Sequence, residues 1–357
     1  MKKVLLGAAM FVAAAGTALA QERVAITPDL VAKAQAEGEV TLLYGSPLIT
    51  MQAIIADFNK AYPKIRVNLE RRSGAAGAQS VIKEKRAGVR RIDVVQSTEV
   101  ESAGDMIREG LFTPFVPENI DSFKPIASGL APHLYAPSTI RSVVMYNPKL
   151  VTEAEVERLR NWDGILDPAF KGRISVVEPS IGAAAAPLLY IMNNPELGAD
   201  FLKKLKAQKP AIYLNSTLGR EAVTSAQQAI SIFSQFDSIA MSDFVRGSPV
   251  RFLYPNPTVE YAGSNWGILA SAPHPNAARL LIAWIMSTEG GIAFQGPLSN
   301  SRSTLKDLGD TRTVLAKLAE TPWYKEPTEL WKPDMQDWVT NFGKYQDTWL
   351  DIMKRSN

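Results

Sequence analysis

A short apolar run, a turn of small residues and a helical segment follow one another repeatedly along this chain, and this order constrains the fold most. Runs rich in Val, Ile and Leu at 40–44, 65–69 and 92–96 predict buried strands. Each is followed by Gly, Ser, Thr or Pro and then by apolar residues at helical spacing. Strands and helices that alternate in this way predict a parallel α/β lobe.

A second series of the same kind follows residue 137, with strands expected at 138–147, 173–177 and 211–214. Two further runs, 250–254 and 259–270, predict a strand pair that bridges the lobes. The fold class expected is therefore α/β with two lobes. We expect the first lobe to comprise residues 21–137 plus about 258–305, and the second lobe to comprise residues 138–257.

The end of the chain carries one apolar stripe. Trp338, Phe342, Tyr345, Trp349 and Ile352 follow one another at spacings of 4, 3, 4 and 3. This spacing places the five side chains on one face of a helix, where packing explains them better than a cofactor site does. We expect 306–357 to be a helical tail docked on a lobe.

Residues 1–20 resemble a secretory signal peptide. Lys2 and Lys3 precede an apolar stretch over 4–15 that is too short to span a bilayer, and Ala18-Leu19-Ala20 is a small-residue cleavage site. The mature chain is then expected to begin at Gln21, and it has no cysteine for a lipid anchor. We expect a soluble protein of the periplasm.

Composition narrows the function. The chain has no cysteine, which excludes disulfides and thiolate metal sites, and its net charge of +3 argues against a nucleic-acid partner. Basic runs such as Arg71-Arg72 are interpreted as solvated faces. His133 and His274 are the only histidines, and neither has the motif context of a catalytic triad. We therefore expect no enzyme and no cofactor, with a secreted hydrolase as an alternative.

One strand-to-helix turn has the character of an anion site. A β-branched strand ending at Val177 leads through Pro179-Ser180-Ile181-Gly182 into an alanine-rich helix. Backbone N–H groups at such a helix start are unpaired, and the helix dipole favours an anion there. The alternative is an ordinary turn whose cap serves only the helix.

With these elements in this order, the chain resembles the periplasmic solute-binding proteins of ABC importers, in the ferric-binding branch of the type II periplasmic-binding fold. The resemblance runs from 39 to about 295. The motifs that carry it are Val40-Thr-Leu-Leu-Tyr-Gly45, Ile92-Asp-Val-Val-Gln-Ser97, Arg141-Ser-Val-Val-Met-Tyr-Asn-Pro-Lys-Leu150, Phe170-Lys-Gly-Arg-Ile174 and Tyr261-Ala-Gly-Ser-Asn-Trp-Gly-Ile-Leu269.

The resemblance implies a monomeric receptor that closes its two lobes on a small solute and delivers it to an inner-membrane ABC permease. The ligand cleft would lie between the lobes, at the carboxyl ends of strands. The candidate ligand-binding residues are Ser46, Ser73, Gly74, Thr98, Arg141, Ser180, Ile181, Gly182, Ser216, Thr217, Gln235, Asp237 and Tyr254.

The chain departs from the ferric members at their metal ligands. Their adjacent tyrosine pair falls here at Phe236-Asp237, their histidine near Pro47, and their glutamate near Thr98, one residue before Glu99. Ferric iron needs anionic oxygen ligands, so we expect no metal at this site. Ferric iron held by scattered phenolates is the alternative, and the tyrosines considered for it are Tyr190, Tyr213, Tyr254 and Tyr261.

We expect instead a small organic anion of the carboxylate, phosphate or phosphonate type. Helix-start N–H groups and hydroxyls would hold it, and Arg141 would be its charged partner. The alternative for Arg141 is a structural salt bridge with an acid such as Glu178. Asp237 would be free to meet an amine if the ligand is a zwitterion.

Overall fold

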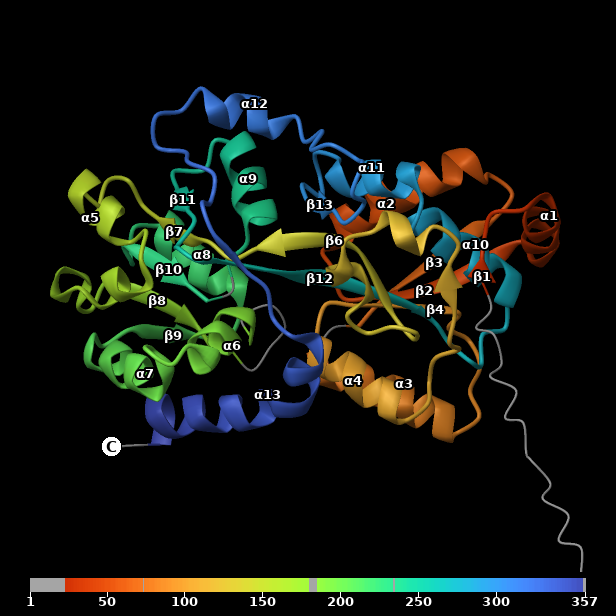
Figure 1. Cartoon of the computed structure of the whole chain (residues 1–357), viewed down its shortest axis with the longest axis horizontal. Helices are drawn as coiled ribbons and strands as arrows, with labels where there is room; N and C mark the ends of the chain where they lie inside the picture. Colours follow the sequence, from red (N-terminus) through yellow and green to blue (C-terminus); the bar gives the residue numbers. More distant parts are fainter. Residues whose placement is uncertain (1–22, 73, 180–184, 234, 356–357) are drawn as a thin grey trace, which may run out of the picture.

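The computed structural model describes residues 23–72, 74–179, 185–233 and 235–355, which form two α/β lobes side by side (Figure 1). The first lobe is built on a seven-stranded sheet in the order β13-β6-β12-β4-β2-β3, with β14 paired to β12. Its strands are β2 (Glu39–Tyr44), β3 (Arg66–Arg71), β4 (Val94–Ser97), β6 (Tyr135–Arg141), β12 (Thr258–Ile268), β13 (Arg302–Ser303) and β14 (Leu330–Trp331).

Parallel pairing in the first lobe follows from its sequence. The strand β2 pairs in parallel with both β3 and β4, whose apolar residues are covered by helices on the two faces. The helices α3 and α4 pack on one face, and α2, α10 and α11 pack on the other. The bounds are α1 (Pro28–Glu37), α2 (Leu48–Ala61), α3 (Gly74–Arg86), α4 (Val100–Arg108), α10 (Pro275–Ile285) and α11 (Thr288–Gln295), with a small sheet of β1 (Arg23–Val24) and β5 (Val116–Pro117).

The second lobe has a five-stranded sheet in the order β11-β7-β10-β8-β9. Its strands are β7 (Val144–Tyr146), β8 (Ile174–Val177), β9 (Ala211–Tyr213), β10 (Ile230–Ile232) and β11 (Arg251–Leu253). Its helices are α5 (Glu153–Arg158), α6 (Ala185–Asn193), α7 (Gly198–Ala207), α8 (Ser216–Thr224) and α9 (Asp237–Val245). Together the two lobes confirm the two-lobed α/β class.

The chain crosses between the lobes a few residues later than the sequence predicts. The single strand expected over 138–147 is two strands, because β6 belongs to the first sheet and β7 to the second. At the crossing, the Ser142 amide donates to Val259 and the Val143 amide donates to Gln235. These bonds to two different segments turn the strand from one sheet to the other, so the change of sheet lies at 142–143 rather than at 138.

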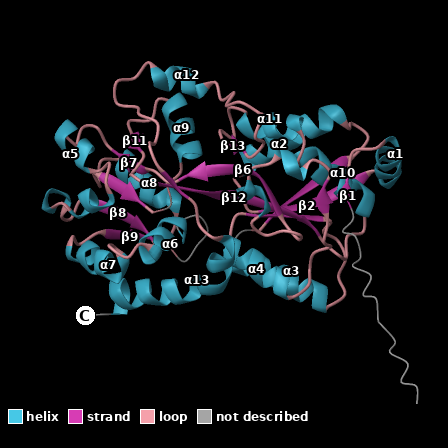
Figure 2. Ribbon diagram, viewed as in Figure 1, coloured by secondary structure: helices cyan, strands magenta, loops and turns pink. Residues whose placement is uncertain are grey.

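The C-terminal segment packs on both lobes rather than on one. Around α12 (Val314–Ala319), the buried Val314 and Leu318 join the second-lobe core with Phe252. The helix α13 (Met335–Leu350) then runs along one side of the molecule and contacts α4 of the first lobe and α6 and α7 of the second (Figure 2). A final turn of π-helix covers Asp351–Arg355.

The apolar stripe of the tail is the packed face of α13. Trp338, Phe342 and Trp349 are buried, and Tyr345 is partly buried. The close approach to α4 depends on Gly104, because a Cβ at that position would lie 2.4 Å from the Cγ1 of Val339.

Among the described residues, no single helix is long and apolar enough to cross a membrane. The bent pair of α10 and α11 passes the same test by length and composition only, with a bend of 67° between the two helices.

Candidate functional site

Three groups of candidate site residues come together in the structure, each in a different place. The first group, here called the first-lobe edge, lies at the carboxyl ends of β2, β3 and β4. Its members are Ser46, Arg71, Gly74, Thr98 and Glu99.

Gln96 holds the first-lobe edge in shape. Its buried amide oxygen accepts from the amides of Gly45 at 2.9 Å and Ser46 at 3.3 Å. Its amide nitrogen donates to the hydroxyls of Ser46 at 3.0 Å and Ser264 at 2.8 Å. The turn after β4 also touches the turn after β2, since a Cβ at Gly45 would lie 2.8 Å from the Thr98 hydroxyl. Ser46 and Thr98 are therefore neighbours, although the sequence separates them.

Neither Ser46 nor Thr98 caps its helix. The N-cap residues are Pro47 for α2 and Glu99 for α4, and neither makes a side-chain cap. The Ser46 hydroxyl is bonded to Gln96 instead. The first turn of α2 contains no acidic residue, so its backbone N–H groups keep their capacity for an anion.

Arg71 is a site candidate that the sequence did not reveal. It ends β3, where its exposed side chain donates from Nε to the Ser46 carbonyl at 3.2 Å. Its two terminal nitrogens have no hydrogen bond or ion pair with any residue in the described ranges. The neighbouring Arg72 differs, because it pairs with Glu70 and with Glu84. The prediction of a solvated pair was therefore wrong for Arg72.

The second group lies at the carboxyl ends of the second-lobe strands. Ser216 and Thr217 begin α8, whose start is capped by Asn215 accepting from the Leu218 amide at 3.0 Å. Gln235 is fully buried and donates to the Ser216 carbonyl at 3.3 Å and to the Ser231 hydroxyl at 3.1 Å. Its amide oxygen has no partner among the described residues.

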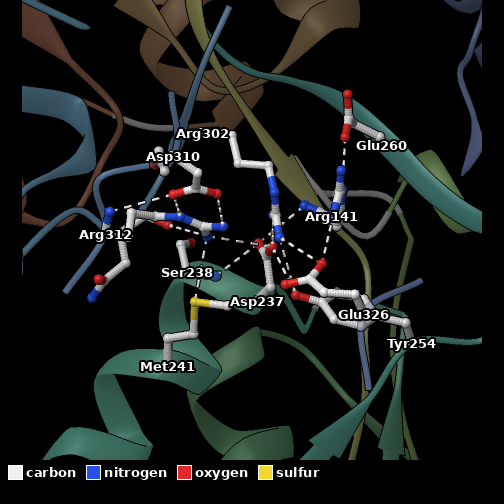
Figure 3. A network of polar contacts seen from close by, with 12 residues as sticks. Arg141, Asp237, Ser238, Met241, Tyr254, Glu260, Arg302, Asp310, Arg312 and Glu326 are labelled. Atoms are coloured by element: carbon white, nitrogen blue, oxygen red, sulfur yellow. Dashed lines mark hydrogen bonds and ion pairs between the residues drawn. The ribbon is translucent and has the colours of Figure 1, made fainter. Parts of the chain in front are cut away.

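The third group is an ion-pair network at the junction of the lobes (Figure 3). The carboxylate of Asp237, at the start of α9, is fully buried and forms an ion pair with Arg302 of β13. It also accepts from the amides of Arg141 at 3.1 Å and Ser238 at 2.8 Å, and from the Tyr254 hydroxyl at 3.2 Å. This carboxylate is saturated, so the expectation that it is free for an amine was wrong.

The charges in this network outweigh the cost of burial. Burial opposes ionisation of Asp237, but Arg302 and then Arg312 hold the pKa of this carboxyl below its usual value. Burial next to the Asp237 carboxylate raises the pKa of Tyr254, which therefore stays a neutral phenol. Neither side chain is available as a metal ligand without breaking these contacts.

Arg141 is held in the same network. Its Nε donates to Glu260 at 2.7 Å, and a terminal nitrogen lies 3.3 Å from Glu326. Arg141 therefore forms a structural salt bridge, which was the alternative to a ligand contact. Its partner is Glu260 rather than the expected Glu178. Glu178 pairs with Lys354 instead.

Several predicted residues are not brought into a site by the described structure. Ser73, Ser180, Ile181, Gly182 and the expected signal peptide lie outside the described residues. The candidate tyrosines are scattered: Tyr190 packs on Trp162 and Trp331, and Tyr261 packs on Phe236 and Trp338. Within the described ranges, no group of three or more His, Asp or Glu side chains is placed to hold a metal ion.

Glu101 gives the region next to the first-lobe edge a pH-dependent stability. It is partly buried on α4, and one carboxylate oxygen is buried without a partner among the described residues. Burial, reinforced by the charge of Glu99, raises the pKa of Glu101 from 4.5 to about 7. The folded protein then binds more protons than the unfolded chain between these values, so this group lowers the free energy of unfolding as pH rises through that window.

We expect Glu101→Gln to raise the free energy of unfolding by about 1–3 kcal/mol at pH 8 and to change it little at pH 4. Urea unfolding at the two pH values measures this. The exposed Glu118→Gln serves as control and should change neither value. A Glu101→Gln variant that is less stable than wild type at pH 8 contradicts the assignment.

Comparison with known proteins identifies the family. The family model for bacterial extracellular solute-binding proteins matches residues 44–292. Among curated proteins, none matches the sequence of this chain. Among solved structures, iron-bound HitA from Pseudomonas aeruginosa is 23% identical, with a TM-score of 0.70 over 88% of this chain and 99% of that one.

Two other structures share the fold at lower identity. AfuA from Actinobacillus pleuropneumoniae, with fructose-6-phosphate bound, is 15% identical with a TM-score of 0.70 over 90% of this chain and 100% of that one. The Trichodesmium protein IdiA (FutA), in complex with iron and citrate, is 16% identical with a TM-score of 0.70 over 89% and 100%. Since the family model covers most of the chain, the protein belongs to the bacterial extracellular solute-binding proteins, which serve ABC transporters.

Proposed function

We propose that this protein captures a small organic anion of the carboxylate, phosphate or phosphonate type between its lobes and delivers it to an inner-membrane permease. Residues 1–20 would direct it to the periplasm and be removed. The observation that carries the choice of an anion is the Arg71 guanidinium beside Ser46, at the uncapped start of α2.

The chemistry of the first-lobe edge supports this proposal. The terminal nitrogens of Arg71 match a carboxylate or phosphate through two parallel hydrogen bonds. The first turns of α2 and α3 contain no acidic residue that would compete for the helix dipole. In this proposal Arg71 takes the role that we first assigned to Arg141, and Ser46 and Thr98 add hydroxyls next to it.

The second group of residues, at the carboxyl ends of the second-lobe strands, supplies the opposite wall in this proposal. Ser216, Thr217 and the unpaired amide oxygen of Gln235 offer further polar contacts. Two of the related structures contain a sugar phosphate and citrate, both of which are organic anions. Ferric iron remains the alternative, because HitA is iron-bound. A visible tyrosinate-to-iron band after addition of ferric citrate would favour iron over an anion alone.

Arg71→Ala is expected to weaken anion binding about tenfold to a hundredfold, because a charge-assisted contact is lost. Titration calorimetry with citrate, fructose 6-phosphate and ethylphosphonate would identify a bound anion and measure the loss. The melting temperature of the empty protein should stay unchanged, since Arg71 is exposed. Arg66→Ala is a matched control, because Arg66 is an exposed arginine at the opposite end of the same strand. Equal losses from both variants would mean that Arg71 acts only through general charge.

The receptor function has its own test. Small-angle scattering with and without the bound anion should show a more compact molecule in its presence, through hinge closure. Steady turnover of the anion would instead support the hydrolase alternative.

A further inference from the structure

We propose that Glu99 binds an ammonium group of the solute, so that the captured anion also carries an amine. This inference rests on the proposed function and narrows its ligand class. Asp237 cannot bind the amine, because its carboxylate is saturated by its own network. The inference therefore assigns amine recognition to Glu99.

Glu99 is an acidic residue that the fold largely buries. The residue is 7% exposed, and its carboxylate makes no hydrogen bond or ion pair with the part of the chain that the structure describes. It is the N-cap residue of α4, yet it does not cap the helix with its side chain. A largely buried carboxylate that has no partner charge among the described residues is a candidate for binding one.

The nitrogen donors nearest to Glu99 have other partners. It lines a small pocket between β4 and α3 with Arg72, Gln96, Ser97 and Ser102. Arg72 is the only cation among the described residues that line this pocket, and it is already paired with Glu70 and Glu84. The donors of Gln96 are used by Ser46 and Ser264. Arg72 and Gln96, the two residues with side-chain nitrogen donors in this lining, are therefore both engaged with partners other than Glu99.

An ammonium fits this arrangement better than a metal ion does. An ammonium has three donors, and one carboxylate with adjacent hydroxyls accepts them. A divalent cation takes several anionic or carbonyl oxygens at once, and the described residues offer no cluster of three acids or histidines. The Thr98 hydroxyl next to Glu99 is the nearest candidate for a second acceptor.

Glu99 and Arg71 both lie next to one turn. The Oε2 of Glu99 would be 3.7 Å from a Cβ at Gly45, and Arg71 donates to the carbonyl of the next residue, Ser46. A cation site and an anion site thus flank the Gly45–Ser46 turn. This arrangement suits a short zwitterion whose amine and acid are separated by a few bonds.

The experiment compares pairs of anions that differ only in the amine. Calorimetry would use β-alanine against propionate, 2-aminoethyl phosphate against ethyl phosphate, and 2-aminoethylphosphonate against ethylphosphonate. In at least one pair, wild type should bind the amine-bearing member about tenfold to a hundredfold more tightly. Glu99→Gln should abolish that preference while leaving the affinity for the amine-free member unchanged.

Glu155→Gln is the matched control, because Glu155 is also 7% exposed but is paired with Arg173 and forms the capping box of α5. It should lower the melting temperature and keep the amine preference. Glu99→Gln should do the reverse, with a melting temperature equal to or above that of wild type, because an unpaired buried charge is removed.

The outcomes separate the two proposals. Equal binding of both members of every pair, or a preference that survives in Glu99→Gln, overturns the role of Glu99 and leaves anion capture standing. Absence of binding by all six compounds overturns the amine-bearing class. Binding of ethanolamine, which has the amine but no acid group, as tightly as the best zwitterion would overturn anion capture itself.

Discussion

Asp237→Ala is expected to lower the free energy of unfolding by about 3–5 kcal/mol, which is the cost of removing one partner from a buried ion pair. The substitution leaves Arg302, 9% exposed, and Arg312, 2% exposed, without their shared carboxylate. It also removes the acceptor of the Arg141 and Ser238 amides. Urea unfolding at neutral pH measures the loss.

Glu326→Gln provides the control within the same network. Glu326 is 52% exposed and pairs with Arg141 and Arg302 at the surface, so its loss should cost less than about 1 kcal/mol. The pKa of Asp237 is lower in the folded protein than in the unfolded chain. Its contribution is therefore present above the unfolded value of 3.8 and is lost as pH falls through the lower folded value. A similar small loss in both variants would show that the network contributes little stability.

Trp338→Ala is expected to lower the free energy of unfolding by about 3–5 kcal/mol, because a large buried side chain is replaced by a cavity. Trp338 is 1% exposed on α13, and its ring lies 5.8 Å from that of Tyr261 on the strand β12 that links the lobes. The same helix packs on α4 and α6, which belong to different lobes. Loss of this side chain therefore loosens contacts of both lobes at once.

Tyr345→Ala on the same helix is the control for Trp338→Ala. Tyr345 is only partly buried, so its removal should cost less than about 2 kcal/mol in the same urea experiment. If the free energy of unfolding of Trp338→Ala is within about 1 kcal/mol of the wild-type value, α13 does not brace the two lobes.

The position where the resemblance to ferric-binding members implies a tyrosine pair holds a structural ion pair in this chain. Asp237 joins β13 and α9 through Arg302, and Arg141 joins β6 and β12 through Glu260. These elements meet where the chain passes between the lobes, so the network fixes the junction rather than offering open ligands. In the proposed function, the first-lobe edge with Arg71 and Glu99 is the charged surface that meets the solute.

The sequence by itself determined the elements and their class. Strands such as 40–44 and helices such as the stripe from Trp338 to Ile352 appear where the apolar spacing predicts them. The prediction of these elements succeeds because the periods of two residues in a strand and 3.6 in a helix depend only on neighbours along the chain and on one buried face. The start of α8 is local in the same sense, because Asn215 accepts a hydrogen bond from the Leu218 amide three residues later.

Tertiary structure alone decided which charges are free. The sequence predicts Arg141 and Asp237 to be ligand residues, but residues from distant segments neutralise both. Glu260 pairs with Arg141, and Arg302 and Arg312 pair with Asp237. Arg71 and Glu99 carry no local signal. They stand out only because their neighbours are paired, whereas the terminal nitrogens of Arg71 and the carboxylate of Glu99 have no partner among the described residues. Charge pairing depends on which segments meet in space, and a single sequence does not encode that in any local period.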